Sequence, residues 1–504
     1  MPILNSIISL INSKRLKQIE EFRKMPGEVQ ARQFRFLIKT AAKTDIGRRY
    51  EFDTLSSTDT FRKRIPVVDY EGVKPYVERL RKGDRDLLWP GEIKWFAKSS
   101  GTTSSKSKFI PVSKDSLEDC HFRGGKDVIA LYLENRPDSE MFSGKCLTLG
   151  GSHQINSFSS DSYFGDLSAI LIENLPFWTL FVRTPSPSIA LMDEWEAKLE
   201  MMTEATIDEN VTSLAGVPSW FLVLLKNVLK KTGKSNLLEV WPNLELFLHG
   251  GINFTPYREQ YKALIPSENM NYLESYNASE GFFAIQDDLT QEGMLLMLDY
   301  GIFYEFMPLL EVGKEFPKTY TIEEVELNKD YAVIISTNGG LWRYLIGDTV
   351  RFTTLFPHRI VITGRTKHFI NAFGEELIID NAERGLQIAC ERTGAIIKEY
   401  SAAPVFMSEN SKGRHQWMIE FEKRPADLNK FAHILDEALK SINSDYEAKR
   451  YKDMTLEGLE IIEAKHNLFI SWLKLNNKLG GQNKVPRLAN NRKFIDELIT
   501  LNNI

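Results

Sequence analysis

Short apolar runs alternate with segments of helical spacing between residues 145 and 275, and this alternation constrains the fold more than any other feature. The run Cys146–Leu149 ends at two glycines, and the run Leu244–Leu248 is followed by a histidine and two more glycines. Leu214–Pro218 leads into a helical pattern that continues from Trp220 to Leu229. Strand-like runs that alternate with helices favour a layer of parallel strands. We therefore predict an α/β fold with layered subdomains for this part of the chain.

After about Gly293 the composition shifts toward short segments rich in β-branched and aromatic residues, from Met294–Leu298 to Leu341–Ile346. Asn338-Gly339-Gly340 separates two of these segments, and a turn of this kind between apolar runs is a strong hairpin signal. We predict that this part is antiparallel and forms a small β-barrel-like region of the large domain.

The segment after Gly364 shows four further patterns, namely a helix at about 380–393, strand-like runs at 395–407 and 416–420, and a helix at about 427–442. Together they suit a small C-terminal α+β domain, since such a segment has a common domain size. We predict two domains, a large one over residues 1–364 and a small mobile one over residues 365–504.

The N-terminus resembles the apolar region of a signal peptide, but asparagines and serines interrupt its isoleucines and leucines. The apolar spacing continues through Leu16, Ile19 and Phe22 at helical intervals, so an amphipathic helix that docks on the body is favoured over secretion. No stretch reaches the roughly 18 uninterrupted apolar residues of a membrane helix. We expect a cytoplasmic protein without a membrane span.

The composition excludes several classes of partner. The chain has 504 residues, with 63 lysines and arginines against 68 aspartates and glutamates, and a formal net charge of −5. Nucleic acid would require clustered basic residues, so no nucleic-acid partner is expected. Cys120, Cys146 and Cys390 form no C-x-x-C pair, which argues against a disulfide framework and a cysteine-rich zinc site.

The first segment that could carry chemistry is Ser99–Lys108, which is rich in serine and threonine and contains Gly101. Hydroxyls and exposed backbone N–H groups can wrap a phosphate chain, and a lysine adds positive charge. An exposed serine-rich linker is the alternative, and the position between strand-like runs at 94–97 and 109–112 favours the phosphate loop. The segment does not fit the Walker A pattern.

Two further segments place polar groups beside glycine. In Tyr276–Gly281, an aromatic ring can stack on a base, and Glu280 can hold Mg²⁺, which prefers one or two carboxylates plus substrate phosphates. In Trp342–Asp348, the terminal aspartate can accept hydrogen bonds from a ribose diol. Ordinary turn residues are the alternative in both segments.

Two basic residues complete the candidates. Arg365 follows Gly364 and either pairs with phosphate oxygens at a hinge or is an ordinary surface arginine. Lys484, in the loop Gly480–Arg487, either carries a positive charge into a distant cleft or belongs to a basic tail. No G-x-S-x-G segment occurs, so the nucleophile elbow of an α/β-hydrolase is not expected.

The order of these segments along the chain resembles that of the Gretchen Hagen group of acyl-acid-amido synthetases, the auxin-responsive enzymes of plants and their bacterial relatives. That group belongs to the adenylate-forming superfamily. The resemblance spans about residue 90 to the end and rests on Ser99–Thr103 with Lys108, Gly216–Trp220, Tyr276–Gly281, Trp342–Asp348, Gly364-Arg365 and Lys484–Arg487.

The resemblance implies a role for each matching residue in binding ATP and magnesium. Tyr276 would line the adenine, Ser279 would lie near the α-phosphate, and Glu280 would help to hold Mg²⁺. Lys108 or Lys106 would contact phosphate. The phosphates would be cradled by the loop Ser99, Ser100, Gly101, Thr102 and Thr103.

The remaining roles lie at the predicted domain boundary and beyond it. Asp348 would bind the ribose hydroxyls, Arg365 would contact ribose or phosphate at the hinge, and Lys484 would enter the site during adenylation. The implied activity is ATP-dependent formation of an acyl-adenylate from a carboxylic acid, and then transfer to an amine, an amino acid in this group. A thioester-forming acyl-CoA synthetase and an inactive nucleotide-binding relative are the alternatives.

Overall fold

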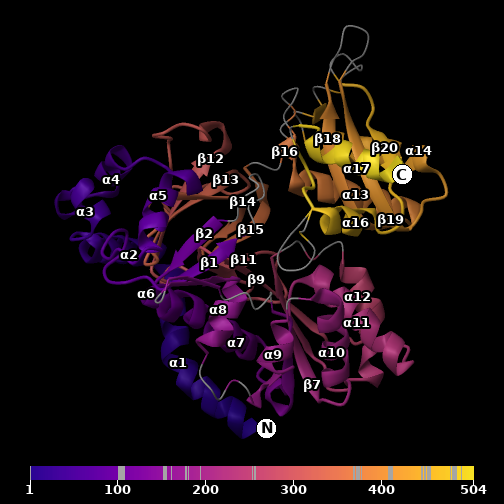
Figure 1. Ribbon diagram of the computed structural model, residues 1–504, viewed down its shortest axis with the longest axis horizontal. Helices are drawn as coiled ribbons and strands as arrows, with labels where there is room; N and C mark the ends of the chain where they lie inside the picture. Colours follow the sequence, from indigo (N-terminus) through magenta and orange to yellow (C-terminus); the bar gives the residue numbers. More distant parts are fainter. Residues whose placement is uncertain are drawn as a thin grey trace. The chain divides into compact units, whose positions relative to one another are not determined.

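The computed structural model (Figure 1) describes residues 2–99, 108–150, 156–159, 162–175, 179, 181–192, 194–251, 254, 257–366, 369–370, 375, 377–406, 413–443, 446–447, 450, 456–476, 478, 485–489 and 491–503. At residues 2–11, 99, 156–159, 195, 219, 220 and 369 only the backbone is described. The described chain forms two compact units, a larger one over residues 2–346 and 350–361 and a smaller one over residues 347–349 and 362–503.

The large unit begins with a group of helices that share one core. Ile19 and Phe22 of the first helix are buried together with Val29 and Leu37 of the second, which confirms the predicted amphipathic helix. Arg15 of the first helix also pairs with a buried carboxylate, at 2.7 Å from Oδ2 of Asp127. The helices are α1 (Pro2–Lys24), α2 (Pro26–Ala41), α3 (Asp45–Arg49), α4 (Thr58–Arg64) and α5 (Tyr70–Leu80).

A layer of parallel strands follows, as the alternating pattern predicted. The strands are β3 (Lys145–Thr148), β6 (Arg183–Thr184), β7 (Val211–Gly216), β8 (Leu246–Gly250) and β9 (Asn271–Ala278), and each pairs in parallel with its neighbour in the order β6-β3-β7-β8-β9. The helices α10 (Trp195–Thr206), α11 (Pro218–Thr232) and α12 (Arg258–Leu264) connect them (Figure 1). Met202, Phe221 and Tyr261 of these helices share a core with Leu214 and Phe247 of the strands.

The antiparallel strands predicted after Gly293 extend this layer instead of forming a separate sheet. The sheet continues beyond β9 in the order β10 (Gly281–Ile285), β11 (Met294–Leu296), β15 (His358–Arg365), β14 (Tyr344–Leu355), β13 (Asp330–Thr337) and β12 (Ile302–Pro308), which gives eleven strands. The predicted hairpin lies between β13 and β14, where Gly340 has a φ of +92°. β12 and β13 are buried along nearly their whole length, which explains their continuous apolar composition.

A smaller sheet and a further set of helices complete the large unit. The sheet has the order β2 (Lys108–Val112), β1 (Trp95–Ser99), β5 (Ser162–Gly165) and β4 (Asn156–Ser159). The helices are α6 (Lys114–Ser116), the π-helix η2 (Leu117–Phe122), α7 (Arg123–Asn135), α8 (Leu167–Glu173) and α9 (Pro187–Ala190).

The small unit has the α+β organisation expected from its pattern. β18 (Ile396–Val405), β19 (Arg414–Lys423) and β20 (Glu460–Glu463) form a sheet, and β16 (Phe369–Ile370) pairs with β17 (Leu377–Ile378). Gly385 lies in the helix Ile379–Thr393, and Leu439 lies in the helix Leu428–Ile442. A Cβ at Gly385 would lie 2.8 Å from Leu439, so these two helices approach closely there. The helices are α13 (Ile379–Thr393), α14 (Leu428–Ile442), α16 (Leu468–Leu475) and α17 (Lys493–Asn503). The predicted mixed α/β fold with a large N-terminal and a small C-terminal part is confirmed.

Over the part of the chain that the structure describes, no helix combines the length and the apolar character that a membrane crossing requires.

Candidate active site

The carboxyl ends of β7 and β8 lie at one edge of the large sheet, beside β9, which continues to Ala278. Gly216 at the end of β7 pairs with His249, and Gly250 at the end of β8 pairs with Ser275. A Cβ atom would lie 2.7 Å from the ring of Phe221 at Gly216, and 2.4 Å from the Ser275 carbonyl oxygen at Gly250, so both positions need glycine. In α/β sheets, ligands bind outside the carboxyl ends of the parallel strands.

His249 is a packing residue at this edge. Its ring stacks on Phe254 with centroids 4.3 Å apart. Burial, together with the positive charge of Arg258, lowers the pKa of His249 to about 3. The imidazole is therefore neutral near pH 7.

Two predicted site residues occupy the tight turn that joins β9 to β10. The two strands pair up to the residues that flank the turn, so Ser279 and Glu280 are its central residues, and both are half-buried. Tyr276 precedes the turn on β9; the residue is 5% exposed, and its ring packs against Phe283 at a centroid distance of 4.8 Å. The turn thus presents a hydroxyl and a carboxylate beside a buried aromatic ring.

A second motif reaches the same turn through Tyr344, the first residue of β14. Tyr344 is fully buried, and its hydroxyl donates a hydrogen bond of 3.5 Å to Oε1 of Glu280, which is at the long limit for such a bond. Burial and the negative charge of Glu280 hold the pKa of Tyr344 well above its usual value, so the hydroxyl keeps its proton. The sequence placed Tyr344 inside a motif but gave it no role, because the contact spans 64 positions.

The carboxylate of Glu280 at this turn can be compared with what a magnesium ion requires. Mg²⁺ keeps several waters and is bound through one or two carboxylates plus substrate phosphates. Among the residues that the structure describes, no three of histidine, cysteine, aspartate and glutamate gather into a cluster that could hold a metal. The single oriented carboxylate of Glu280 therefore fits an ion that takes its other ligands from a bound triphosphate and from water.

The predicted phosphate loop connects β1 to β2. These strands are antiparallel and pair Ser99 with Lys108, so the strand-like runs on either side of the loop are confirmed. Nζ of Lys108 lies 5.9 Å from the centre of the Tyr70 ring. The side chain of Ser99 lies outside the described residues, as do Ser100, Gly101, Thr102, Thr103 and Lys106.

The small unit brings two other predicted residues together. Nε of Arg365 donates a hydrogen bond of 2.6 Å to Oδ1 of Asp348. The side chain of Arg365 is 39% exposed and that of Asp348 is 12% exposed. The residue before the aspartate, Gly347, has a φ of +96°, which favours glycine. The sequence had assigned these two side chains separate contacts, and the structure joins them in one ion pair.

The predicted lysine near the C-terminus, Lys484, lies outside the described residues. The chain that follows it is anchored to β18. Oγ of Ser401 donates to the carbonyl oxygen of Pro486 at 2.7 Å, and the N–H of Ala402 donates to the carbonyl oxygen of Arg487 at 2.7 Å. The segment that begins at Val485 is therefore held on the small unit by hydrogen bonds to its backbone carbonyl oxygens.

One buried histidine beside β9 was not among the candidates. His121 lies in the π-helix η2, is 4% exposed, and shares a side-chain hydrogen bond with Asn277. Burial lowers the pKa of His121 to about 4. π-Helical segments are frequent at functional sites.

Two solved structures share the fold of this chain. The GH3.15 acyl acid amido synthetase has a TM-score of 0.78 at 16% identity, over 97% of this chain and 95% of that one. A 2-hydroxyisobutyryl-CoA ligase, solved in the postadenylation state with R3-HIB-AMP, has a TM-score of 0.57 at 12% identity, over 94% and 92% of the two chains. The fold is therefore that of adenylate-forming ligases.

Family models identify the group within that class. The GH3 family N-terminal domain matches residues 15–270, the central domain matches residues 295–365, and the C-terminal domain matches residues 380–493. This chain belongs to the GH3 family, which confirms the resemblance to the Gretchen Hagen group.

The curated relatives of the chain are ligases. The indole-3-acetic acid-amido synthetase GH3.3 of Arabidopsis thaliana is 22% identical over 94% of this chain and 91% of its own length. The 4-substituted benzoates-glutamate ligase GH3.12 of the same plant is 21% identical over 97% of each chain. The prediction of an enzyme of the amido synthetase class is thereby confirmed.

Proposed function

We propose that this chain uses ATP to join a carboxylic acid to an amino acid through an amide bond. Membership of the GH3 family supports the class of reaction. The observation that carries the proposal is the hydrogen bond from Tyr344 to Glu280, because it joins two of the motifs assigned to the nucleotide. The turn at Glu280 follows β9, which pairs in parallel with β8, and β8 pairs in parallel with β7. The glycines that end β7 and β8 therefore lie at the same edge of the sheet as this turn.

In the first half-reaction, an oxygen of the substrate carboxylate attacks the α-phosphorus of ATP. The bond from that phosphorus to the bridging oxygen breaks, and pyrophosphate leaves with its electron pair. The protein supplies position and charge neutralisation and forms no covalent bond. Bound magnesium would screen the phosphate charge, and Glu280 would hold it. Loss of one donor that faces the developing charge costs on the order of 10²–10³ in rate.

The remaining site residues take part as their positions in the family pattern imply. The loop Ser99–Thr103, with Lys108 or Lys106, binds the phosphates, and Ser279 lies near the α-phosphate. Asp348 binds the ribose, Arg365 contacts ribose or phosphate, and Tyr276 lines the adenine. Lys484 enters the site during adenylation.

In the second half-reaction, the amine nitrogen attacks the acyl carbon of the adenylate. The amide bond forms, AMP leaves, and the nitrogen loses a proton. Water must be excluded, because it hydrolyses the mixed anhydride. We propose that the domain over residues 365–504 rotates against the domain over residues 1–364 between the two steps. The cytoplasm stays our prediction for the location of this enzyme.

The experiment that tests the proposed function is isotope exchange between ATP and pyrophosphate against a library of carboxylic acids. At least one acid is expected to support exchange, and exchange should stop when that acid is omitted. The active acid is then incubated with ATP and pooled amino acids, and the product mass is measured.

The product mass decides the acceptor. A mass equal to acid plus amino acid minus water supports the proposal. A thioester formed only when coenzyme A is added would overturn the amide assignment. Absence of acid-dependent exchange across a broad panel would overturn the adenylation itself.

A further inference from the structure

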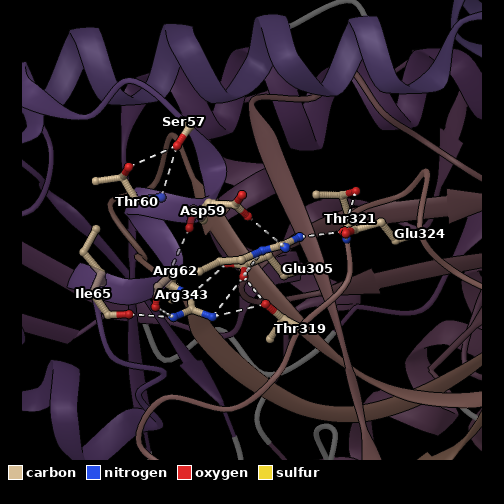
Figure 2. A network of polar contacts seen from close by, with 11 residues as sticks. Ser57, Asp59, Thr60, Arg62, Ile65, Glu305, Thr319, Thr321, Glu324 and Arg343 are labelled. Carbon is tan, nitrogen blue, oxygen red and sulfur yellow. Dashed lines mark hydrogen bonds and ion pairs between the residues drawn. The ribbon is translucent and has the colours of Figure 1, made fainter.

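An arginine lies fully buried one residue before Tyr344. The side chain of Arg343 is 0% exposed, and that of Glu305 on β12 is 1% exposed. The guanidinium meets this carboxylate through two bonds, from Nε to Oε2 and from Nη2 to Oε1, both 2.9 Å long. Thr319 joins this ion pair: its hydroxyl donates to Oε1 of Glu305 at 2.7 Å and accepts from Nη2 of Arg343 at 3.3 Å (Figure 2).

The other side of the guanidinium holds the end of helix α4. Nη1 of Arg343 donates to the carbonyl oxygen of Arg62 at 2.8 Å and to that of Ile65 at 2.6 Å (Figure 2). The last carbonyls of a helix have no partner within the helix, and a positive charge is favourable there. Arg343 therefore links α4 to β12 through the start of β14.

The backbone at Arg343 is strained and is held from several directions. Its φ is +42°, in the left-handed region that residues with a side chain rarely adopt. Its N–H donates to Oγ of Ser336 at 3.0 Å, and its carbonyl oxygen accepts from the N–H of Val68 at 3.1 Å. The carbonyl oxygen of Val68 in turn accepts from the N–H of Leu345 at 2.8 Å. The residue between the two contacts to Val68 is Tyr344.

We propose that Arg343 is a positioning residue that aims the Tyr344 hydroxyl at Glu280 and so orients the carboxylate that holds magnesium. This inference rests on the proposed function for the role of Glu280. The buried guanidinium and the strained backbone of Arg343 have no direct part in the reaction steps given above. Because its side chain is fully buried, Arg343 would act through Tyr344 and not by direct contact with nucleotide or metal.

The test measures binding and not turnover. ATP binding is titrated calorimetrically in magnesium and again in EDTA, and the ratio of the two dissociation constants gives the magnesium-dependent gain. Tyr344→Phe removes only the hydroxyl and is expected to reduce this gain about 10-fold, as for other groups that orient metal ligands. Arg343→Lys keeps the charge but cannot form the planar fork, and it is expected to reduce the gain by a similar factor.

A matched control separates positioning from general loss of stability. Arg359 also forms a two-bond pair, with Nε and Nη2 at 2.8 and 3.0 Å from the buried carboxylate of Asp287, in the same large unit. Arg359→Lys is expected to lower the melting temperature and to leave the magnesium-dependent gain at its wild-type value. Ser336→Ala provides a second, milder variant, which removes only the acceptor of the Arg343 N–H and is expected to reduce the gain in the same direction.

The double variant Arg343→Lys/Tyr344→Phe gives the sharpest outcome. If Arg343 acts through the Tyr344 hydroxyl, the double variant loses no more of the gain than Tyr344→Phe alone, because coupled residues are not additive. Multiplied losses, or a wild-type gain in both Arg343→Lys and Ser336→Ala, would overturn the inference. If Arg343→Lys does not fold, Ser336→Ala decides alone. Wild-type protein that shows acid-dependent exchange but fails this test keeps its proposed function, so the two failures are distinguishable.

Discussion

Two arginine–carboxylate pairs involve the motif Trp342–Asp348, and they differ in burial. Arg343 and Glu305 are 0% and 1% exposed, whereas Arg365 and Asp348 are 39% and 12% exposed. A buried ion pair cannot exchange its partner for solvent or ligand without a large desolvation cost. A pair that reaches solvent can exchange its partner at a small cost in free energy. We therefore expect the first pair to hold the local backbone geometry and the second pair to be able to exchange its partner for a ligand.

The largest expected effect comes from breaking the buried pair. Glu305→Leu leaves the guanidinium of Arg343 in the core without its carboxylate. We expect the free energy of unfolding to fall by about 3–5 kcal/mol, the usual result of removing one partner from a buried pair. Urea denaturation of the full chain measures this loss.

A double variant shows whether the loss comes from the stranded charge. Glu305→Leu/Arg343→Met removes both charges, and apolar replacements of buried pairs are often neutral or stabilising. The double variant should therefore be more stable than Glu305→Leu alone. Equal or greater loss in the double variant would contradict this explanation.

The pair of Arg365 and Asp348, whose arginine reaches solvent, should show the opposite behaviour. Asp348→Ala is expected to weaken ATP binding about 10- to 100-fold, since a hydrogen bond to a charged group contributes about 1.5–3 kcal/mol. The free energy of unfolding should change by less than about 1 kcal/mol, because the Arg365 guanidinium that is left behind reaches solvent. Calorimetric titration with ATP and urea denaturation measure the two quantities.

Asp330→Ala is the matched control for that prediction. Asp330 pairs with Arg351 at 2.9 Å, with side chains 22% and 21% exposed, and it has no assigned contact with the nucleotide. ATP binding should be unchanged in this variant. A similar loss of affinity in both variants would show that Asp348 has no specific role in binding the nucleotide.

The sequence predicted features that depend on neighbouring residues better than features that depend on distant contacts. Local patterns carry local structure, so the alternation between residues 145 and 275 and the helical spacing at 427–442 predicted the parallel layer and α14. The hairpin signal at Asn338–Gly340 predicted that β13 and β14 are neighbours, but no local signal predicted that β15 lies beside β11 in the eleven-stranded sheet. Pairing between distant strands depends on the whole sheet and not on any one segment.

The candidate site shows the same division. Residue types beside glycines predicted Glu280 and Asp348 as candidates, and their roles stay predictions. Arg343 gave no signal, because arginine is almost never fully buried unless paired and its partner Glu305 lies 38 positions away. Tyr344 was missed for the same reason. Side chains that act through tertiary contacts cannot be separated from surface residues before the fold is known.

His249 is a buried polar residue that forms no ion pair with the described residues, and it differs in this from both arginine–carboxylate pairs. Over the described residues, Nδ1 of His249 has no hydrogen-bond partner, and burial and the charge of Arg258 lower the pKa of His249 to about 3. An unfolded histidine takes up a proton near pH 6.5, whereas the folded one does not until about pH 3. The unfolded state therefore binds more protons throughout this window, and the stability contributed by the neutral ring is lost as the pH falls.

The change in the free energy of unfolding over one pH unit is the smallest effect that we predict. Between pH 6.5 and 5.5 the group should cost about 1 kcal/mol of the free energy of unfolding. His249→Phe keeps an aromatic ring against Phe254 and cannot be protonated, so the stability difference between wild type and variant should shift toward the variant as the pH falls. Urea denaturation at a series of pH values measures it. Parallel pH profiles for the two proteins would mean that the folded state protonates His249 as readily as the unfolded chain, and that burial alone does not set its charge.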